Sequence, residues 1–290
     1  MKIAVASGKG GTGKTTIAAS LAVALAEQGA KISCLDCDVE APNAHIFLQP
    51  AFDQSKEVTL QIPEVNTELC AGCGRCAKVC EFNAIIVFGS DPLVFPKLCH
   101  GCGSCTLVCP EHAISEIPRP LGLLESGPAM QGINFAHGVL SVGEPLAVPV
   151  ISQLKKWAAP TASEITILDS PPGSSCPVVE SLRGADYVIL VTEPTPFGLH
   201  DLKLALQLTQ ELDLPAGVIL NRDGIGDDGV EKYCEAGGLP ILMRIPFERQ
   251  IGAGIAQGKT LVEIHPEYLQ HFQDLYQLIL TLIPANQGAR

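Results

Sequence analysis

Short runs of consecutive apolar residues recur along the chain, separated by longer segments in which apolar positions are spaced as in helices. Such runs are typical of strands buried on both faces of a parallel sheet, because those strands alternate little with polar residues. We predict strands at 2–7, 31–38, 165–168, 187–191, 218–222 and 239–245. Since strands alternate with helical segments, the pattern predicts an α/β fold, a mostly parallel sheet with helices on both faces.

Two helices stand out in this pattern. The first spans about 14–28, directly after the first strand, and the last spans about 266–283. The last helix has one apolar face, which consists of Leu269, Phe272, Leu275, Ile279 and Leu282. The glycine-rich segment 122–150 fits neither a helical nor a strand pattern.

Two copies of one cysteine pattern interrupt the alternation of strands and helices. Residues 70–87 and 99–116, aligned at a period of 29, agree at nine of eighteen positions. Each copy reads C-x2-C-x2-C-x3-C, a spacing in which three thiolates bind one [4Fe–4S] cluster and the fourth reaches across to another. The spacing predicts two such clusters, one held by Cys70, Cys73, Cys76 and Cys109 and one held by Cys99, Cys102, Cys105 and Cys80.

Zinc sites and a disulfide framework are the other interpretations of these cysteines. Zinc sites usually lack a third cysteine at this short spacing followed by a fourth, and disulfides need an oxidising compartment. The doubled spacing therefore favours clusters. We predict a ferredoxin-like insert at 63–118, between the first part of the main domain at 1–62 and its second part at 119–290.

The segment after the first strand matches the phosphate-binding pattern G-x4-G-K-[ST]. Strand, glycine loop and helix follow in the order that this motif requires, because backbone N–H groups and the helix N-terminus then surround the phosphates. Lys14 is expected to reach the β- and γ-phosphates and Thr15 to bind Mg²⁺. The predicted phosphate loop consists of Gly8, Lys9, Gly10, Gly11, Thr12, Gly13, Lys14, Thr15 and Thr16.

Asp169 follows the predicted strand 165–168 directly. A carboxylate at the carboxyl end of a buried parallel strand beside a phosphate loop commonly supports Mg²⁺ binding, together with the Ser or Thr of the loop. We therefore expect Thr15 and Asp169 to serve the same ion.

The loop KGGTGKTT resembles the deviant phosphate loop of the MinD/ParA superfamily, which includes the nitrogenase iron protein and Mrp-type cluster carriers. The resemblance implies that Lys9 crosses an interface to the partner's nucleotide, in a homodimer or in a dimer with a related subunit. The segment 38–43 resembles the superfamily's first switch, which implies that Asp38 orients the attacking water and that Asn43 assists. The alternative is that these two residues only cap the next helix.

Asn221 and Arg222, at the end of a later strand, resemble the superfamily's adenine-reading motif. The Asn221 amide can both donate to and accept from the adenine edge, and Pro246 is expected in a loop beside the base. The segments TEPTPFGLHDL and ILNRDGIG, together with an insert after the first switch, are typical of a smaller group within the superfamily. Over the whole chain they resemble the P-loop ATPases of this superfamily that contain an inserted ferredoxin domain.

Four cysteines lie outside the repeats. Cys34 and Cys37 are three residues apart on a predicted strand and point to opposite faces, so we expect buried small side chains rather than a shared metal. Cys176 lies seven residues after Asp169, the offset of one cluster ligand in the nitrogenase iron protein, but 121–168 contains no cysteine to complete that site. Mrp-type carriers bear a C-x2-C pair after the Asn–Arg strand, whereas only Cys234 lies there in this chain.

A formal net charge of −12 and a sequence pI near 5.0 argue against nucleic-acid binding, which needs a basic face. The same charge gives no general attraction to anionic membranes, and no apolar run approaches the length of a membrane span. Cluster thiolates need reducing conditions, and the N-terminus lacks the pattern of a signal peptide. We expect a cytoplasmic protein without a nucleic-acid partner and without membrane insertion.

These features predict an ATPase that binds ATP or ADP with Mg²⁺ and gates electron transfer through two [4Fe–4S] clusters to an unidentified redox partner protein. One alternative is a cluster assembly or delivery factor, in which the clusters are cargo. Another is a redox-sensing, ATP-dependent positioning protein. Eight buried thiolates favour the first function over the second, because cargo clusters need exposed and transferable ligands.

Overall fold

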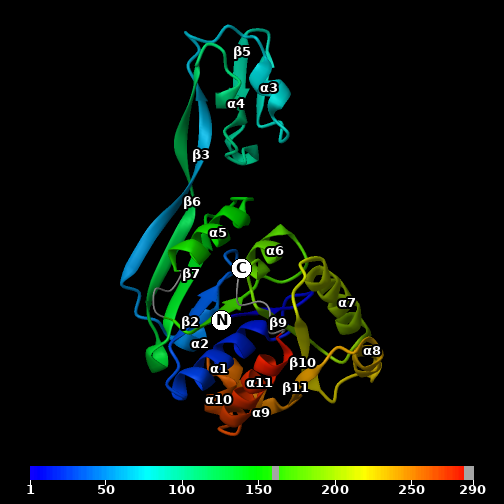
Figure 1. Cartoon of the computed structure of the whole chain (residues 1–290). Coiled ribbons are helices and arrows are strands. Elements are labelled where there is room, and N and C mark those ends of the chain that lie inside the picture. Colours follow the sequence, from blue (N-terminus) through cyan, green and yellow to red (C-terminus); the bar gives the residue numbers. More distant parts are fainter. Residues whose placement is uncertain (159–162, 284–290) are drawn as a thin grey trace. The chain divides into compact units, whose positions relative to one another are not determined.

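The computed structural model describes residues 1–158 and 163–283 and divides the chain into two compact units (Figure 1). The first unit comprises Met1–Ser55, Leu124–Val139 and Ile151–Arg290, and the second comprises Lys56–Leu123 and Leu140–Val150. The cysteine repeats lie in the second unit, and all predicted nucleotide-site residues lie in the first.

The described residues form a nine-stranded sheet in the order β11-β10-β9-β1-β8-β2-β7-β6-β3. Every pair from β11 across to β7 is parallel, which confirms the mostly parallel α/β fold. The strands are β1 Lys2–Ala6, β2 Ile32–Asp36, β3 Gln54–Val65, β6 Ile114–Pro128, β7 Asn134–Leu140, β8 Ile165–Asp169, β9 Tyr187–Thr192, β10 Ala216–Asp223 and β11 Ile241–Pro246.

Helices cover both faces of this sheet. Ile3 and Val5 of β1 belong to the core shared with the first and last helices, whereas Ala4 and Ala6 on the opposite face are also buried. Helices α6 and α7 contact strands β1, β8 and β9. The helices are α1 Lys14–Glu27, α2 Ala44–Leu48, α5 Ala147–Trp157, α6 Cys176–Leu182, α7 Pro196–Glu211, α8 Gly229–Gly237, α9 Arg249–Ile255, α10 Leu261–Ile264 and α11 Tyr268–Leu282.

Three details differ from the sequence predictions. The segment 122–150 contains the end of β6, a 3-10 turn at Met130–Gly132, strand β7 and the start of α5. Strand β2 ends at Asp36 rather than at 38, because the chain turns there so that backbone N–H groups further along can donate to the Asp36 carboxylate. The face of α11 is buried as predicted at Phe272, Leu275 and Ile279, but Leu282, in the last turn, is exposed.

The second unit repeats one small motif. Helices α3 Arg75–Val79 and α4 Ser104–Leu107 each begin after a glycine in the left-handed conformation, Gly74 (φ 70°) and Gly103 (φ 70°). Strands β4 Ile85–Phe88 and β5 Asp91–Val94 form an antiparallel hairpin. Since both cysteine repeats fold as a loop, a left-handed glycine and a short helix, the sequence repeat is also a structural repeat.

Within the described ranges, no helix is both long enough and apolar enough to cross a membrane.

Candidate functional site

A pocket of about 1210 Å³, its mouth included, lies among the loops that follow the parallel strands of the first unit. Its walls contain most of the predicted nucleotide-site residues, whereas Gly8, Lys9, Thr12 and Asp169 are outside the lining. The volume is sufficient for a nucleotide. The predicted residues that line it are Gly10, Gly11, Gly13, Lys14, Thr15, Thr16, Asp38, Asn43, Asn221, Arg222 and Pro246.

Gly13 connects the phosphate loop to α1. Its φ of 95° lies in the left-handed region, and a Cβ at this position would lie 2.5 Å from Asn221 Nδ2. Asn221 Nδ2 donates to the Thr12 carbonyl oxygen at 2.7 Å, and its Oδ1 accepts from the Arg222 backbone N–H at 2.9 Å. Asn221 therefore supports the loop and keeps one N–H and one acceptor site for a ligand.

Lys14 is the first residue of α1 and is buried, with 7% of its surface exposed. Burial lowers the pKa of this ammonium group, and the carboxylates of Asp169 and Asp38 oppose the shift. A buried cation at a helix N-terminus, where backbone N–H groups point outward, makes this end of the pocket suited to a phosphate.

Asp169 and Asp36 are aligned neighbours on the parallel strands β8 and β2, and both are fully buried. Burial raises the pKa of both carboxyl groups, that of Asp36 to about 6, and the negative charge of Asp36 raises the pKa of Asp169 further. Asp36 accepts backbone N–H groups from Asp38, Asn43 and Ala44. Neither Asp169 oxygen has a partner at hydrogen-bonding distance, although the Thr15 hydroxyl is near enough to oppose the rise in pKa.

Asp38 and Asn43 lie on the loop between β2 and α2 and line the pocket. Burial raises the pKa of Asp38, and the nearby Lys14 lowers it. Asn43 occupies the N-cap position of α2, but its side chain makes no capping hydrogen bond. The Asn43 amide is thus not used by the helix that it precedes. The local turn depends on Asp36, to which the sequence analysis assigned no role.

Glu193 is a second residue that the sequence analysis missed. Its buried carboxylate binds Lys9 Nζ at 3.2 Å and Arg222 Nη1 at 2.6 Å. Arg222 also donates to the Gly11 carbonyl oxygen at 3.2 Å and has a left-handed backbone, with φ 55°. The only signal in the sequence was an acidic residue directly after the buried strand β9, close to the carboxyl end of the sheet at which Asp169 ends β8.

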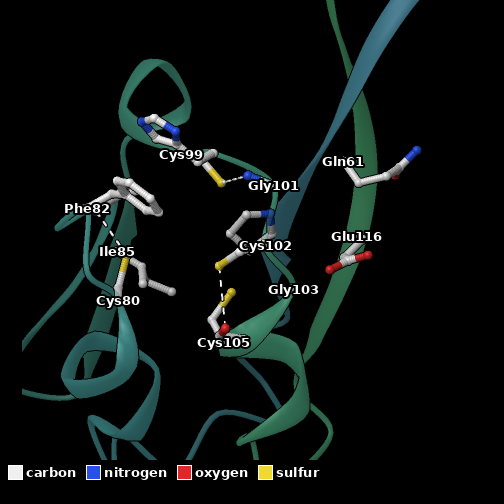
Figure 2. Close-up of a pocket in the computed structure, with 14 residues that line it drawn as sticks. Gln61, Cys80, Phe82, Ile85, Cys99, Gly101, Cys102, Gly103, Cys105 and Glu116 are labelled. Atoms are coloured by element: carbon white, nitrogen blue, oxygen red, sulfur yellow. Dashed lines mark hydrogen bonds between the residues drawn. The ribbon is translucent and has the colours of Figure 1, made fainter. Parts of the chain in front are cut away.

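Cys80, Cys99, Cys102 and Cys105 line one pocket of the second unit, and their sulfur atoms point toward a common space (Figure 2). Backbone N–H groups donate to two of the sulfurs, from Gly101 to Cys99 at 3.4 Å and from Ala84 to Cys80 at 3.3 Å. The structure therefore brings Cys80 of the first repeat together with three cysteines of the second.

Cys70, Cys73, Cys76 and Cys109 line a second pocket of the same unit. The Ala113 backbone N–H donates to Cys109 Sγ at 3.4 Å, as that of Ala84 does to Cys80 in the other pocket. All twelve cysteines are unbridged. Over residues 1–158 and 163–283, no three His, Cys, Asp or Glu side chains are placed to hold a single metal ion.

The remaining cysteines lie in the first unit. Cys34, Cys37 and Cys234 are buried, which confirms the expected burial of the first two, although Cys37 lies beyond the end of β2. Burial raises the pKa of Cys234 to about 11. Cys176 is exposed and is the first residue of α6.

Comparison with known proteins gives relatives over most of the chain. The chain is 32% identical over 284 residues to an uncharacterised protein of Methanocaldococcus jannaschii, with 98% of each chain covered. It is 26% identical to an iron-sulfur cluster carrier protein of Aquifex aeolicus, covering 91% of this chain and 62% of that one.

Solved structures with the same fold include the septum site-determining protein MinD of Pyrococcus horikoshii, complexed with Mg-ADP. The match has a TM-score of 0.58 and 21% identity and covers 96% of this chain and 95% of that one. The family model of the CobQ/CobB/MinD/ParA nucleotide binding domain matches residues 3–262. The model thus covers most of the chain, and the protein belongs to this family of nucleotide-binding domains.

Proposed function

We propose that this protein is an ATPase whose second unit carries two resident [4Fe–4S] clusters and transfers electrons through them to a protein partner in the cytoplasm. The cluster held by Cys70, Cys73, Cys76 and Cys109 is named the first cluster, and that held by Cys99, Cys102, Cys105 and Cys80 the second cluster. The observation that carries the proposal is the exchange of the fourth cysteine between the two pockets. A bis-cluster ferredoxin uses the same exchange.

The side chains around the two pockets fit iron–sulfur clusters better than single ions. A cubane takes its four thiolates at four separate iron atoms, so its ligand sulfurs stand farther apart than those around one zinc ion. That spread agrees with four sulfurs around each pocket and no three-ligand site for one ion among the described residues. Backbone N–H groups that donate to Cys80 and Cys109 would stabilise the thiolate form.

The phosphate-loop pocket supports ATP binding and hydrolysis. Lys14 and the N-terminus of α1 would bind the phosphates, and Asn221 would read the adenine edge. Thr15 and Asp169 suit Mg²⁺. Asp169 is buried and neither of its carboxylate oxygens has a hydrogen-bond partner, so a divalent cation could bind them. Asp38 would orient the attacking water, and Lys9 would reach the nucleotide of a second subunit.

A cluster delivery factor is the second candidate. It is favoured by the relative that is named an iron-sulfur cluster carrier protein and by the exposed thiols of Cys73 and Cys102. The expectation of eight buried cysteines was wrong, but against delivery the other six cysteines of the two sets are buried or half-buried. Resident clusters are therefore the better account.

Two measurements test the proposal. Anaerobically purified protein should contain about eight iron atoms and about eight acid-labile sulfides per chain. Clusters labelled with ⁵⁷Fe should then remain with the protein when it is incubated with an apo-ferredoxin acceptor and ATP, while dithionite reduces them reversibly. Zinc in place of iron would overturn the cluster assignment, and ATP-dependent transfer of the label would establish delivery instead.

A further inference from the structure

The two cysteine pockets correspond through the 29-residue repeat but differ in their charged residues, and one of these differences is at Glu116. Glu116 aligns with Val87. Glu116 lines the pocket of the second cluster, and Val87 lines the pocket of the first. The chain thus contains its own comparison between a pocket with a carboxylate at this position and one without.

The Glu116 carboxylate lies beside the loop that carries Cys102. Figure 2 shows it reaching from β6 toward Gly103, and a Cβ placed on Gly103 would lie 3.0 Å from Glu116 Oε1. The Thr106 hydroxyl donates to the same oxygen at 3.4 Å.

The corresponding place in the other pocket is apolar. Val87 packs against the buried side chains of Cys76, Ile85 and Ile114. Around Gly74, which aligns with Gly103, a Cβ would meet no atom within 4 Å. The first pocket therefore has no carboxylate where the second has Glu116.

The other charged residues that line the pockets do not cancel this difference. Arg75 and Glu111 line the first pocket and carry opposite charges. The second pocket has Glu116 as its acidic residue together with His100, whose ring stacks on Phe82 with 3.7 Å between centroids. Arg119 does not line that pocket and is paired with Glu144. The second pocket thus has the more negative surroundings.

We propose that Glu116 lowers the reduction potential of the second cluster below that of the first, an inference that rests on the proposed function. A fixed negative charge opposes the addition of an electron to a nearby cluster. An electron on the reduced second cluster then passes to the oxidised first cluster, which makes the first cluster the exit toward an acceptor. The step oxidises one cluster and reduces the other by one electron, without bond or proton changes.

The test is a pair of redox titrations followed by EPR on anaerobic, cluster-loaded protein. Glu116→Gln should raise the lower of the two midpoint potentials, by as much as a tenfold change in the equilibrium for reduction, ~59 mV for one electron. The higher of the two midpoint potentials should be unchanged in Glu116→Gln. Glu116→Asp keeps the charge and should keep the potential low, and Glu57→Gln removes an exposed charge that lines neither pocket and should change nothing.

Val87→Glu provides the reciprocal experiment, with Val87→Gln as a polar control of the same length. The charged variant should lower the higher potential relative to the neutral one. Unchanged potentials in Glu116→Gln, or an equal shift of both clusters, would overturn the inference. A protein that holds no pair of clusters by iron and sulfide analysis would overturn the proposed function instead, so the two failures are distinguishable.

Discussion

Lys9 of the phosphate loop forms an ion pair with Glu193 of its own chain, with 3.2 Å between Nζ and Oε2. The same carboxylate binds Arg222 beside the proposed adenine site. If Lys9 serves the nucleotide of a second subunit, its ammonium group must leave Glu193 first. Dimer formation and the release of this ion pair are then a single exchange of partners.

Lys9→Ala should weaken ATP-dependent dimerisation by about tenfold or more, because one charge-assisted hydrogen bond to phosphate is lost. The measurement is sedimentation equilibrium with a non-hydrolysable ATP analogue and without nucleotide. Only the nucleotide-bound dimer should be affected. Lys156→Ala, which removes an exposed lysine of α5, is the control. A Lys9→Ala protein that dimerises normally with the analogue would contradict the cross-subunit role.

Glu193→Gln should have the opposite effect on the same equilibrium. It removes the charge that holds Lys9 within its own chain, so the lysine becomes available at lower cost and the nucleotide-bound dimer tightens by up to about fivefold. Glu235→Gln, an exposed acidic residue of α8, is the matched control. Weaker dimerisation in Glu193→Gln would indicate that Glu193 positions Lys9 for the partner rather than retaining it.

Asp38→Ala should leave ATP binding largely intact and slow hydrolysis by at least about 100-fold, because the attacking water loses its orienting group. Lys14→Ala should instead abolish binding, since the phosphates lose a buried cation. Nucleotide affinity by fluorescence and phosphate release over time separate the two defects. Equal loss of binding in both variants would refute separate roles for these residues.

Asp169→Asn should stabilise the nucleotide-free protein while it abolishes the response to Mg²⁺. The carboxylate is fully buried and neither oxygen has a hydrogen-bonding partner, so its charge is costly in the fold. Removing the charge should raise Tm by about 3 °C. Thermal unfolding with and without Mg-ATP measures both effects, and a lower Tm without ligand would show that the charge is compensated in the free protein.

Strands with both faces buried, such as β1, β8 and β9, could be predicted from the sequence, because they are continuous apolar runs. Strand β6 could not, because it contains three prolines and its formation depends on pairing with distant segments rather than on its own apolar pattern. The contact of Glu193 with Lys9 joins residues 184 positions apart, and local spacing carries no information about it. The cysteine spacing, by contrast, already indicates that the fourth cysteine of each copy joins the other set, and the two pockets have that lining.

His137→Phe should remove part of the loss of stability at acidic pH. His137 is buried between Phe52 and Phe135, pairs with Glu125 at 3.0 Å, and lies beside His45. Burial lowers the pKa of His137, so the folded chain keeps the ring neutral while the unfolded chain takes up a proton below about pH 6.5. Protonation of the unfolded state therefore reduces stability as the pH falls through this value.

Denaturant unfolding at pH 7.5 and at stepwise lower pH measures the difference. The wild-type protein should lose stability more steeply below pH 6.5 than His137→Phe, and His271→Gln, which changes an exposed histidine of α11, should behave as the wild type. Parallel pH profiles of wild type and His137→Phe would assign the acid sensitivity to other groups.

Cys80→Ser is the sharpest test of the exchanged cysteines. Cys80 belongs to the first repeat in sequence, but in the structure it lines the pocket of Cys99, Cys102 and Cys105. The substitution should therefore damage the second cluster, with iron falling from about eight toward about four atoms per chain or a three-iron EPR signal appearing, while the first cluster stays intact. Cys109→Ser should do the reverse, because Cys109 lines the other pocket. Since serine replaces one sulfur by one oxygen in both variants, differences in folding cannot explain opposite outcomes. If Cys80→Ser instead destroyed the cluster of its sequence neighbours, each repeat would close its own site, and the ferredoxin-like arrangement would have to be abandoned.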